Sequence, residues 1–235
     1  MPMRIMMVEG RYKGEITLDG LRPQELPQKL GLISTVQFLD QIPQVQEALE
    51  KAGKVVFVDK MRQKYETQLL GCDQGAAMKN KDAVDAYFYF GTGVFHPLGV
   101  VIAAEKDVYC YDPLSGIQTK IPKETGMAMN KRRKGAYLTF LHAKNVGILV
   151  SMKPGQNNFK KAMGIKENHP EKNCYIFVQD TLDFNQIENF PFVDVWINTA
   201  CNRIMDDADK FPKPLIDLAD LEKEENKTGL ISVKV

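Results

Sequence analysis

The stretch LGLISTV, residues 30–36, decides the fold. A short apolar run rich in branched side chains, without the period of an amphipathic helix, is typical of a strand buried in a parallel sheet. Segments with helical character follow at residues 44–51 and 97–104. Strands that alternate with helices predict βαβ units and a parallel sheet. We expect three more strands of this kind, at residues 55–58 (VVFV), 86–90 (AYFYF) and 108–111 (VYCY).

A long charged segment, residues 123–144, comes next, and we expect it to be a helix that joins two units. Its basic run, residues 131–134 (KRRK), is interpreted as a solvated helix face rather than a binding patch. The strand pattern then begins again. We expect strands at residues 146–151 (VGILVS), 175–178 (YIFV) and 193–197 (VDVWI), with a helix at residues 157–167.

The two halves of the sequence resemble each other. LGLISTVQ is similar to VGILVSMKPGQ, and VDAYFYFGTG is similar to VDVWINTAC. Two diverged copies of one α/β unit explain this most simply, although shared fold chemistry alone also produces weak repeats. We therefore predict an α/β protein of two similar parallel-sheet units, with helices on the sheet faces and a cleft between the units.

We divide the chain into four segments. Residues 1–28 contain several glycines and prolines and no lasting period, so we expect an N-terminal arm. Residues 29–140 form the first α/β unit, and residues 141–225 form the second. The charged run EKEENK marks the start of a solvated tail, residues 226–235.

The composition argues against several classes of protein. With 31 basic and 30 acidic residues, the net charge of +1 gives no support for a nucleic-acid-binding surface. No apolar run approaches the roughly 20 residues needed to cross a bilayer, and the first residues lack the apolar core of a signal peptide. We expect a cytoplasmic protein with neither a membrane nor a nucleic acid as partner. The four cysteines are too few for a disulfide scaffold in a chain of this length, and they are interpreted as buried thiols, metal ligands or redox groups.

Ligands of open parallel sheets bind beyond the carboxyl ends of the strands. The turn at residues 91–93 (GTG) offers backbone amides to a carboxylate or phosphate, although a plain strand-to-helix turn has the same sequence. One histidine beyond it is either a ligand contact or a residue that starts a helix. The lysine and glutamine of KPGQ either bind a carboxylate or form a polar loop. The candidate binding residues are Thr35, Gln37, Gly91, Thr92, Gly93, His96, Asp112, Lys153, Gly155 and Gln156.

The four cysteines fall into two kinds. Cys110 and Cys174 lie in or beside predicted strands with bulky apolar neighbours, where a free cysteine commonly packs as a small hydrophobic residue. Cys72 (LLGCDQGAA) and Cys201 (NTACNR) lie in predicted loops beside glycine or alanine, which leaves space next to each sulfur. A pair of thiolates on two units suggests an iron–sulfur cluster or a metal ion in the groove between them. Because no CxxC spacing is present, this signal is weak by itself.

Taken together, these segments resemble the diphthamide synthase family over residues 30–222. The resemblance implies an enzyme that attaches the 3-amino-3-carboxypropyl group of S-adenosylmethionine to a histidine of translation elongation factor 2. It further implies three similar α/β domains that each give one cysteine to a 4Fe-4S cluster, whose open iron binds S-adenosylmethionine for radical cleavage of a carbon–sulfur bond. The segments that carry the resemblance, in the family's order and spacing, are LGLISTVQFLDQI, LLGCDQGAA, YFGTGVFHPLGVVIA, VYCYDPLSG, GILVSMKPGQ, FPFVDVWINTACNRI and KFPKPLIDLADLE.

By this resemblance, Cys72 matches the cluster cysteine of the family's second domain and Cys201 that of the third. Two features depart from the family pattern. A counterpart of the first domain with its cysteine is expected to be absent, because residues 1–28 are short and contain no cysteine. The family's cysteine-proline-arginine reads Cys201-Asn202-Arg203 here, which changes the backbone freedom of the loop without removing a ligand.

The resemblance therefore implies an enzyme subunit, a radical-type aminocarboxypropyltransferase whose third thiolate comes from a second chain. The alternative is a non-catalytic relative that binds S-adenosylmethionine or a synthase partner. A third hypothesis is a structural remnant with neither ligand. The two loop cysteines, with the GTGVFHPLG and KPGQ segments, favour the first hypothesis over the third but do not separate the first from the second.

Overall fold

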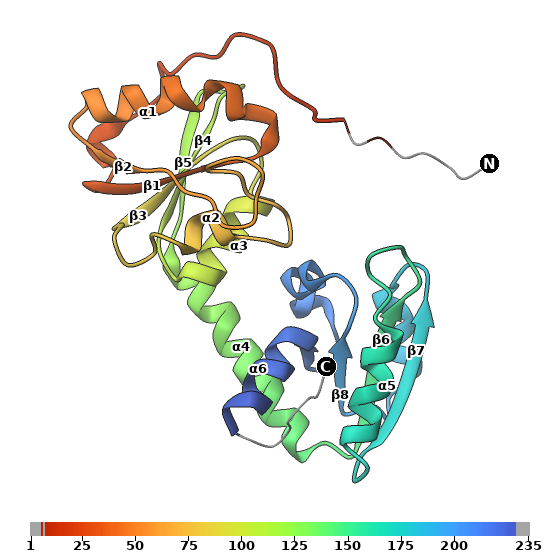
Figure 1. Ribbon diagram of the computed structural model, residues 1–235. Coiled ribbons are helices and arrows are strands. Elements are labelled where there is room, and N and C mark those ends of the chain that lie inside the picture. Colours follow the sequence, from red (N-terminus) through yellow and green to blue (C-terminus); the bar gives the residue numbers. More distant parts are fainter. Residues whose placement is uncertain (1–5, 7, 229–235) are drawn as a thin grey trace. The chain divides into compact units, whose positions relative to one another are not determined.

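The computed structural model describes residue 6 and residues 8–228, and the chain forms two compact units (Figure 1). Unit 1 is Met1–Met129 and unit 2 is Asn130–Val235. The division falls within helix α4 (Lys123–His142), whereas the sequence analysis places it at residue 140, near the end of that helix. Helix α4 therefore contributes residues to both units.

Unit 1 contains a five-stranded sheet in the order β2-β1-β3-β4-β5. The first four strands along the chain are parallel, which confirms the expected βαβ pattern, and the fifth returns antiparallel to β4. All five residues of β3 are buried, because this strand lies in the middle of a sheet that is covered on both faces. The strands are β1 (Lys29–Ser34), β2 (Val55–Phe57), β3 (Ala86–Phe90), β4 (Val108–Asp112) and β5 (Ile117–Ile121).

Hydrophobic clusters lie on both faces of this sheet, because alternate residues of a strand point to opposite faces. On one face Phe88 packs with helix α1 (Ile42–Lys51). On the other face Tyr89 packs with helix α3 (Phe95–Ala104). The shorter elements of the unit are η1 (Pro23–Glu25), η2 (Val36–Gln41) and α2 (Gly75–Met78).

The segment expected to be an N-terminal arm packs against unit 1. The hydroxyl of Tyr111, near the end of β4, donates to the carbonyl oxygen of Thr17 at 2.9 Å. The partly buried side chains of this segment join the same hydrophobic cluster as α1, so they extend the core of the unit. They are Tyr12, Ile16, Leu18 and Leu21.

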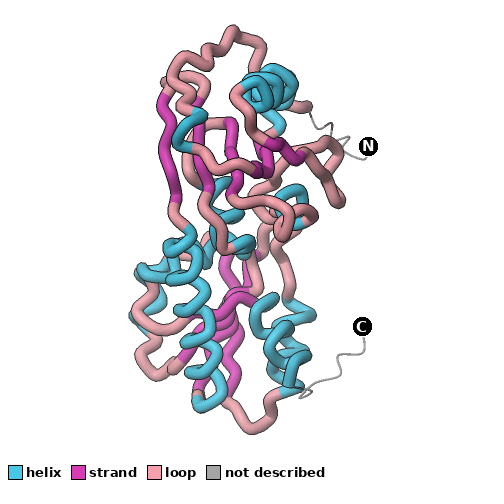
Figure 2. The backbone as a smooth tube through the Cα atoms, turned by 90° about the vertical axis from the view of Figure 1, so that its left-hand side faces the viewer, coloured by secondary structure: helices cyan, strands magenta, loops and turns pink. Residues whose placement is uncertain are grey.

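Unit 2 contains a four-stranded, fully parallel sheet in the order β7-β6-β8-β9. One face is covered by α5 (Phe159–Asn168), α6 (Leu218–Thr228) and the second half of α4. On the other face, η3 (Phe184–Asn189) and η4 (Asn202–Lys210) pack in a cluster around Trp196. Figure 2 traces the helices and strands of each unit along the backbone. The strands are β6 (Asn145–Ser151), β7 (Asn173–Gln179), β8 (Val195–Asn198) and β9 (Leu215–Asp217).

Three features differ from the sequence-based predictions. The run at residues 55–58 is expected to be buried, but β2 is an edge strand and Val55 is 46% exposed. The short strands β5 and β9 lack a long apolar run, so the pattern does not reveal them. The charged run at residues 222–227 belongs to α6, where Leu218, Leu221 and Glu225 are buried at helical spacing. In the part of the chain that the structure describes, no helix is long and apolar enough to cross a membrane.

Candidate functional site

The carboxyl ends of β1, β3 and β4 lie side by side at one edge of the unit 1 sheet. Ser34 is paired with Phe90, and Phe90 is paired with Tyr111. The hydroxyl of Ser34 donates to the carbonyl oxygen of Phe90 at 2.6 Å and ties the first two strand ends together. The structure therefore brings the predicted site residues that follow these positions next to one another: Thr35, Gly91 and Asp112.

The side chain of Tyr89 contacts this edge, although the sequence does not predict it as a site residue. Its hydroxyl donates to the carbonyl oxygen of Thr92 at 3.2 Å. A Cβ at Gly91 would lie 2.7 Å from the same hydroxyl, so only glycine fits at that position. Burial raises the pKa of Tyr89 to about 12, which keeps the hydroxyl protonated and able to donate. The alternation in AYFYF is the signal that places Tyr87 and Tyr89 on one face.

The turn at residues 91–93 leads directly into helix α3. Gly93 has a φ of +71°, in the left-handed region that favours glycine, and α3 begins at Phe95. His96 lies in the first turn of this helix, half-buried, with its ring nearly perpendicular to that of Phe95. The turn thus sets backbone amides at the start of a ten-residue helix, where the helix dipole favours an anionic group.

A closed loop next to α3 presents Cys72. Leu70 and Asp73 exchange two backbone hydrogen bonds of 3.1 Å each, which close the loop. A Cβ on Gly71 would meet the ring of Phe95 at 3.0 Å, so the loop packs against the first turn of α3. The thiol of Cys72 is free and exposed. An exposed thiol on a constrained loop is suited to binding a ligand, because little conformational freedom is left to lose.

Asp112 and Gln37 have structural contacts at this edge. One carboxylate oxygen of Asp112 accepts the amides of Leu114 and Ser115 at 2.8 and 3.3 Å, which closes the turn between β4 and β5. Gln37 lies in η2, where its backbone carbonyl accepts the amide of Tyr12 at 2.7 Å. The predicted roles of Asp112 and Gln37 in binding a cofactor stay predictions.

In unit 2 the loop after β6 forms a tight turn. The hydroxyl of Ser151 accepts the amide of Lys153 at 3.2 Å, and the amide of Gln156 donates to the carbonyl oxygen of Lys153 at 3.0 Å. Gly155 closes the turn with a left-handed φ of +77°. Lys153 is exposed and Gln156 is half-buried, so the ammonium group of Lys153 is accessible to an anionic ligand.

The loop after β8 lies beside this turn. The hydroxyl of Thr199 donates to the carbonyl oxygen of Leu149, on the neighbouring strand β6, at 2.7 Å. The side-chain amide of Asn158, just beyond the turn, donates to the carbonyl oxygen of Thr199, also at 2.7 Å. The predicted residues Lys153 and Cys201 therefore come from adjacent loops at one edge of unit 2.

The side chain of Asn198 holds the backbone around Cys201. Asn198 is fully buried at the end of β8. Its carbonyl oxygen accepts the amide of Ala200 at 3.0 Å, and its amide donates to the carbonyl oxygen of Cys201 at 2.9 Å. The same amide donates to Asp217, on the neighbouring strand β9, at 3.1 Å. Cys201, whose free thiol is half-buried, is thereby fixed at the start of η4.

Two carboxylates near this loop are poorly solvated. Burial raises the pKa of Asp217, although the amide of Ala219 donates to it at 3.0 Å and favours its charged form. Burial also raises the pKa of Asp206, and its ion pair with Arg203 at 2.6 Å opposes that rise. Asn198 and Asp217 are not predicted from the sequence as site residues, because their contact depends on the pairing of β8 with the short strand β9.

Cys110 and Cys174 are buried in β4 and β7, as the sequence analysis expects. Burial raises the pKa of Cys110 to about 12, and it also raises the pKa of Cys174. Because the thiolate is the form that binds metals, both residues are poor ligands where they lie. Two thiols lie outside the buried strands, Cys72 in unit 1 and Cys201 in unit 2, and their role as ligands stays a prediction.

Among the residues that the structure describes, no group of three or more histidine, cysteine or carboxylate side chains is placed to hold a metal ion. Each of the two available thiols is suited to one corner of an iron–sulfur cluster. The cleft between the units and a joint site for both cysteines stay predictions.

Comparison with known proteins covers most of the chain. A profile of the family described as diphthamide synthesis protein matches residues 12–227. The 2-(3-amino-3-carboxypropyl)histidine synthase of Pyrococcus horikoshii is 26% identical over 85% of this chain and 58% of its own length. Subunit 1 of the synthase from Bos taurus is 30% identical over 85% of this chain and 45% of its own length. The chain thus spans about half the length of these curated relatives.

Solved structures agree with the fold. The crystal structure of Dph2 from Pyrococcus horikoshii is similar with a TM-score of 0.67 and 25% identity, over 89% of this chain and 60% of that one. A second structure of that protein, described as having a 4Fe-4S cluster, is similar with a TM-score of 0.66 and 24% identity. The likeness confirms the α/β fold expected from the alternation of strands and helices.

Proposed function

Because the chain belongs to the family of diphthamide synthesis proteins, we propose that it is a subunit of a 2-(3-amino-3-carboxypropyl)histidine synthase. The proposed reaction transfers the 3-amino-3-carboxypropyl group of S-adenosylmethionine to a histidine of translation elongation factor 2, in the cytoplasm. Relatives that match 85% of this chain carry the name of this enzyme. The chain spans about half of their length. We assign to it the part of the active site that Cys72 and Cys201 would hold.

The single observation that carries the proposal is the division of the four cysteines. Cys72 and Cys201 have free thiols on loops held by hydrogen bonds, whereas the other two are buried in strands. This donor set fits two corners of a 4Fe-4S cluster, and such clusters are ligated by thiolates. We propose that Cys72 and Cys201 hold iron and that a partner chain supplies the third thiolate. When bound, the cluster supplies the electron for cleavage of a carbon–sulfur bond of S-adenosylmethionine.

The strand-end loops are proposed to hold S-adenosylmethionine. Lys153 is exposed and offers its ammonium group to the methionine carboxylate. The backbone amides of the turn at residues 91–93 are donors at the start of a helix. They are suited to binding the methionine carboxylate or the ribose of S-adenosylmethionine. The remaining candidate contacts are Thr35, Gln37, His96, Asp112, Gly155 and Gln156.

The experiment that tests the proposed function measures the product. The chain is reconstituted without oxygen in the presence of a family member that carries a further cluster cysteine, and it is then given S-adenosylmethionine, a reductant and elongation factor 2. Mass spectrometry of the factor should show the added group on a histidine. The Cys72→Ala and Cys201→Ala variants should lose this product, and the matched Cys110→Ala variant should retain it.

A second candidate function is a non-catalytic subunit that binds S-adenosylmethionine or the synthase partner. The observation that favours it is that only two of the four cysteines are available as ligands. The two functions differ in one measurable respect. If Cys72→Ala and Cys201→Ala leave the modification by the complex unchanged, the chain supports the enzyme without giving it iron ligands.

A further inference from the structure

The backbone at Cys201 has a defined conformation that its own side chain does not maintain. Cys201 has a φ of −70° and a ψ of 125°, which is extended backbone, and its thiol makes no capping hydrogen bond to η4. Its carbonyl oxygen accepts the amide of Ile204 at 3.1 Å and the side-chain amide of Asn198 at 2.9 Å. Two donors fix the direction of this carbonyl, so the conformation of Cys201 depends on Asn198.

The side-chain amide of Asn198 has two hydrogens and two acceptors. Besides the carbonyl oxygen of Cys201, it donates to a carboxylate oxygen of Asp217 at 3.1 Å. The carbonyl oxygen of the same side chain accepts the amide of Ala200 at 3.0 Å. If the side-chain amide were turned over, its oxygen would face two acceptors and its nitrogen would face a donor. The side chain of Asn198 therefore has one favourable orientation.

Asp217 is anchored in the sheet and at the start of α6. It is buried, and it is paired with Asn198 in the register of β8 and β9. Its second carboxylate oxygen accepts the amide of Ala219 at 3.0 Å. Hydrogen bonds thus run from the strand pair through Asp217 and Asn198 to the backbone of Cys201.

We propose that Asp217 is a positioning residue for Cys201 and that it acts through Asn198. The pair holds the backbone of Cys201 in its extended conformation before any ligand arrives, and a preformed ligand residue loses less conformational freedom when it binds. The positioning of Cys201 stands on the geometry of this chain alone. That the ligand of Cys201 is iron rests on the proposed function.

A proline at position 202 would impose the same backbone without these side chains. The residue before a proline is restricted to extended conformations, and Cys201 already has one. Asn202 is the first residue of η4, a position that accepts proline because its N–H has no partner within the helix. Asn202→Pro should therefore restrain Cys201 independently of Asn198 and Asp217.

An exchange of the two side chains isolates the contact with Cys201. In the Asn198→Asp, Asp217→Asn chain, the amide at position 217 can donate to the carboxylate at position 198, so the contact between β8 and β9 is kept. The backbone amides of Ala200 and Ala219 keep their acceptors. Only the donor to the carbonyl oxygen of Cys201 is lost, and a carboxylate oxygen faces this carbonyl instead. The net charge of the chain does not change.

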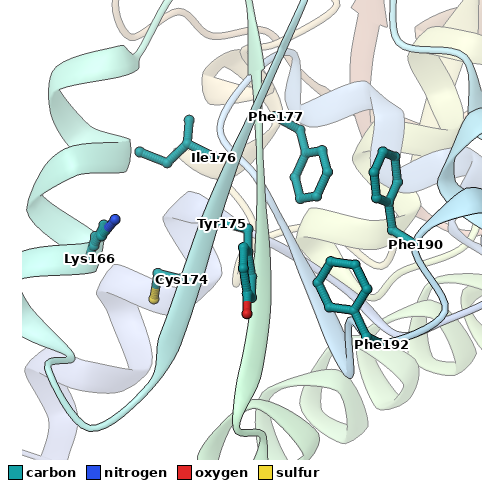
Figure 3. Close-up of a pocket in the computed structure, with 7 residues that line it drawn as sticks. All are labelled: Lys166, Cys174, Tyr175, Ile176, Phe177, Phe190 and Phe192. Carbon is teal, nitrogen blue, oxygen red and sulfur yellow. The ribbon is translucent and has the colours of Figure 1, made fainter.

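The cysteines of the chain itself provide the measurement. A thiol reagent modifies the exposed Cys72 of unit 1, which calibrates the reagent in every sample. Cys174 of β7 is among the residues that line an open pocket of about 460 Å³, but it is buried (Figure 3). Its modification therefore reports unfolding of unit 2. The rate at Cys201, compared with these two references, reports on the loop after β8.

The exchanged chain should differ from the wild type at Cys201 alone. Relative to Cys72, Cys201 should be modified about fivefold faster, as expected for the loss of one hydrogen bond, while Cys174 stays protected. Addition of Asn202→Pro to the exchanged chain should return the rate to near that of the wild type. Asn202→Ala, added in the same way, is the matched control and should leave the rate high.

An unchanged rate at Cys201 in the exchanged chain, or a raised rate that proline does not lower, would overturn the proposal. If Cys174 also becomes reactive, the exchange has unfolded unit 2, and Asp217→Ala then decides. That variant keeps Asn198 and removes only its anchor, so it should again raise the rate at Cys201 with Cys174 protected, and no increase would refute the role of Asp217. A wild-type chain that holds no iron with its partner would refute the proposed function and leave these rates unaffected.

Discussion

The side-chain amide of Asn198 donates a hydrogen bond to the carbonyl oxygen of Cys201 at 2.9 Å. Asn198 is fully buried and also donates to the buried Asp217, so its removal leaves two acceptors without this donor. We expect Asn198→Ala to lower the free energy of unfolding by about 1–3 kcal/mol in a urea titration. The exposed neighbour Asn202 supplies the control, since Asn202→Ala should change the free energy of unfolding by less than about 0.5 kcal/mol. Equal effects of the two changes would show that Asn198 does not hold the loop.

The thiols should differ in their reactivity. At pH 8 a thiol reagent should modify the exposed Cys72 rapidly and the half-buried Cys201 more slowly. Cys110 and Cys174 should react only after denaturation, because they are buried and burial raises the pKa of both thiols. Peptide mapping by mass spectrometry identifies the modified residues. Modification of Cys110 in the folded protein at the rate of Cys72 would contradict the division of the cysteines into two kinds.

Stability should depend on pH through His169. Its Nε2 atom lies 2.8 Å from a carboxylate oxygen of Glu225 on α6, and this contact, opposed by desolvation, raises the pKa of His169 above its ordinary 6.5. The folded state therefore binds the proton more tightly than the unfolded state does. The added stability is complete below pH 6.5 and is lost as the pH rises through the higher folded-state pKa.

We expect the unfolding free energy of the wild-type chain to fall by about 1 kcal/mol more than that of His169→Gln between pH 6 and pH 9. Urea titrations at several pH values measure this difference. The carboxylate of Glu171 lies 3.3 Å from the Nδ1 atom and also raises the pKa of His169. Glu171→Gln should therefore remove a smaller part of the pH dependence of the unfolding free energy than His169→Gln does. Parallel pH curves for the wild type and His169→Gln would refute the contact as a source of stability.

The chain should bind S-adenosylmethionine or its methylthioadenosine fragment. Isothermal calorimetry with each compound tests this, and Lys153→Ala should weaken binding of S-adenosylmethionine more than binding of methylthioadenosine, which lacks the carboxylate. Lys160, exposed on α5, provides the matched control Lys160→Ala. No heat with either compound, even after reconstitution with iron and sulfide, would favour a structural remnant.

The central strands of both units could be predicted from the sequence, because their apolar runs are continuous. Helix α4 could be predicted as a long charged segment between the two strand patterns. The strand at residues 86–90 has the predicted bounds, since every residue of β3 is buried. The short strands β2, β5 and β9 could not be predicted with the same success. Val55 is exposed although its run is apolar, and β9 has only three residues before α6 begins. Their positions depend on pairing with distant strands.

In the candidate site, too, some features could be predicted from the sequence and others could not. The sequence predicts that Thr35 and Gly91 lie near strand ends, and the structure has them directly after β1 and β3. Their role in binding stays a prediction. The residues that hold these loops were missed, because nothing near Asn198 or Tyr89 in the sequence specifies their hydrogen-bond partners. Asp112 is predicted as a ligand contact, and this stays a prediction, since the structure shows only that one of its carboxylate oxygens closes the turn before β5.

The most direct test of the shared cluster is the iron content of the isolated chain. Its two available thiols are at least one fewer than the three or four that a 4Fe-4S centre normally uses. After anaerobic reconstitution with iron and sulfide, the absorbance and electron paramagnetic resonance spectra should show little or no stable cluster in the chain alone, and a stable cluster once a partner with a further cluster cysteine is added. A stable four-iron centre in the lone, monomeric chain that modifies elongation factor 2 would contradict the account.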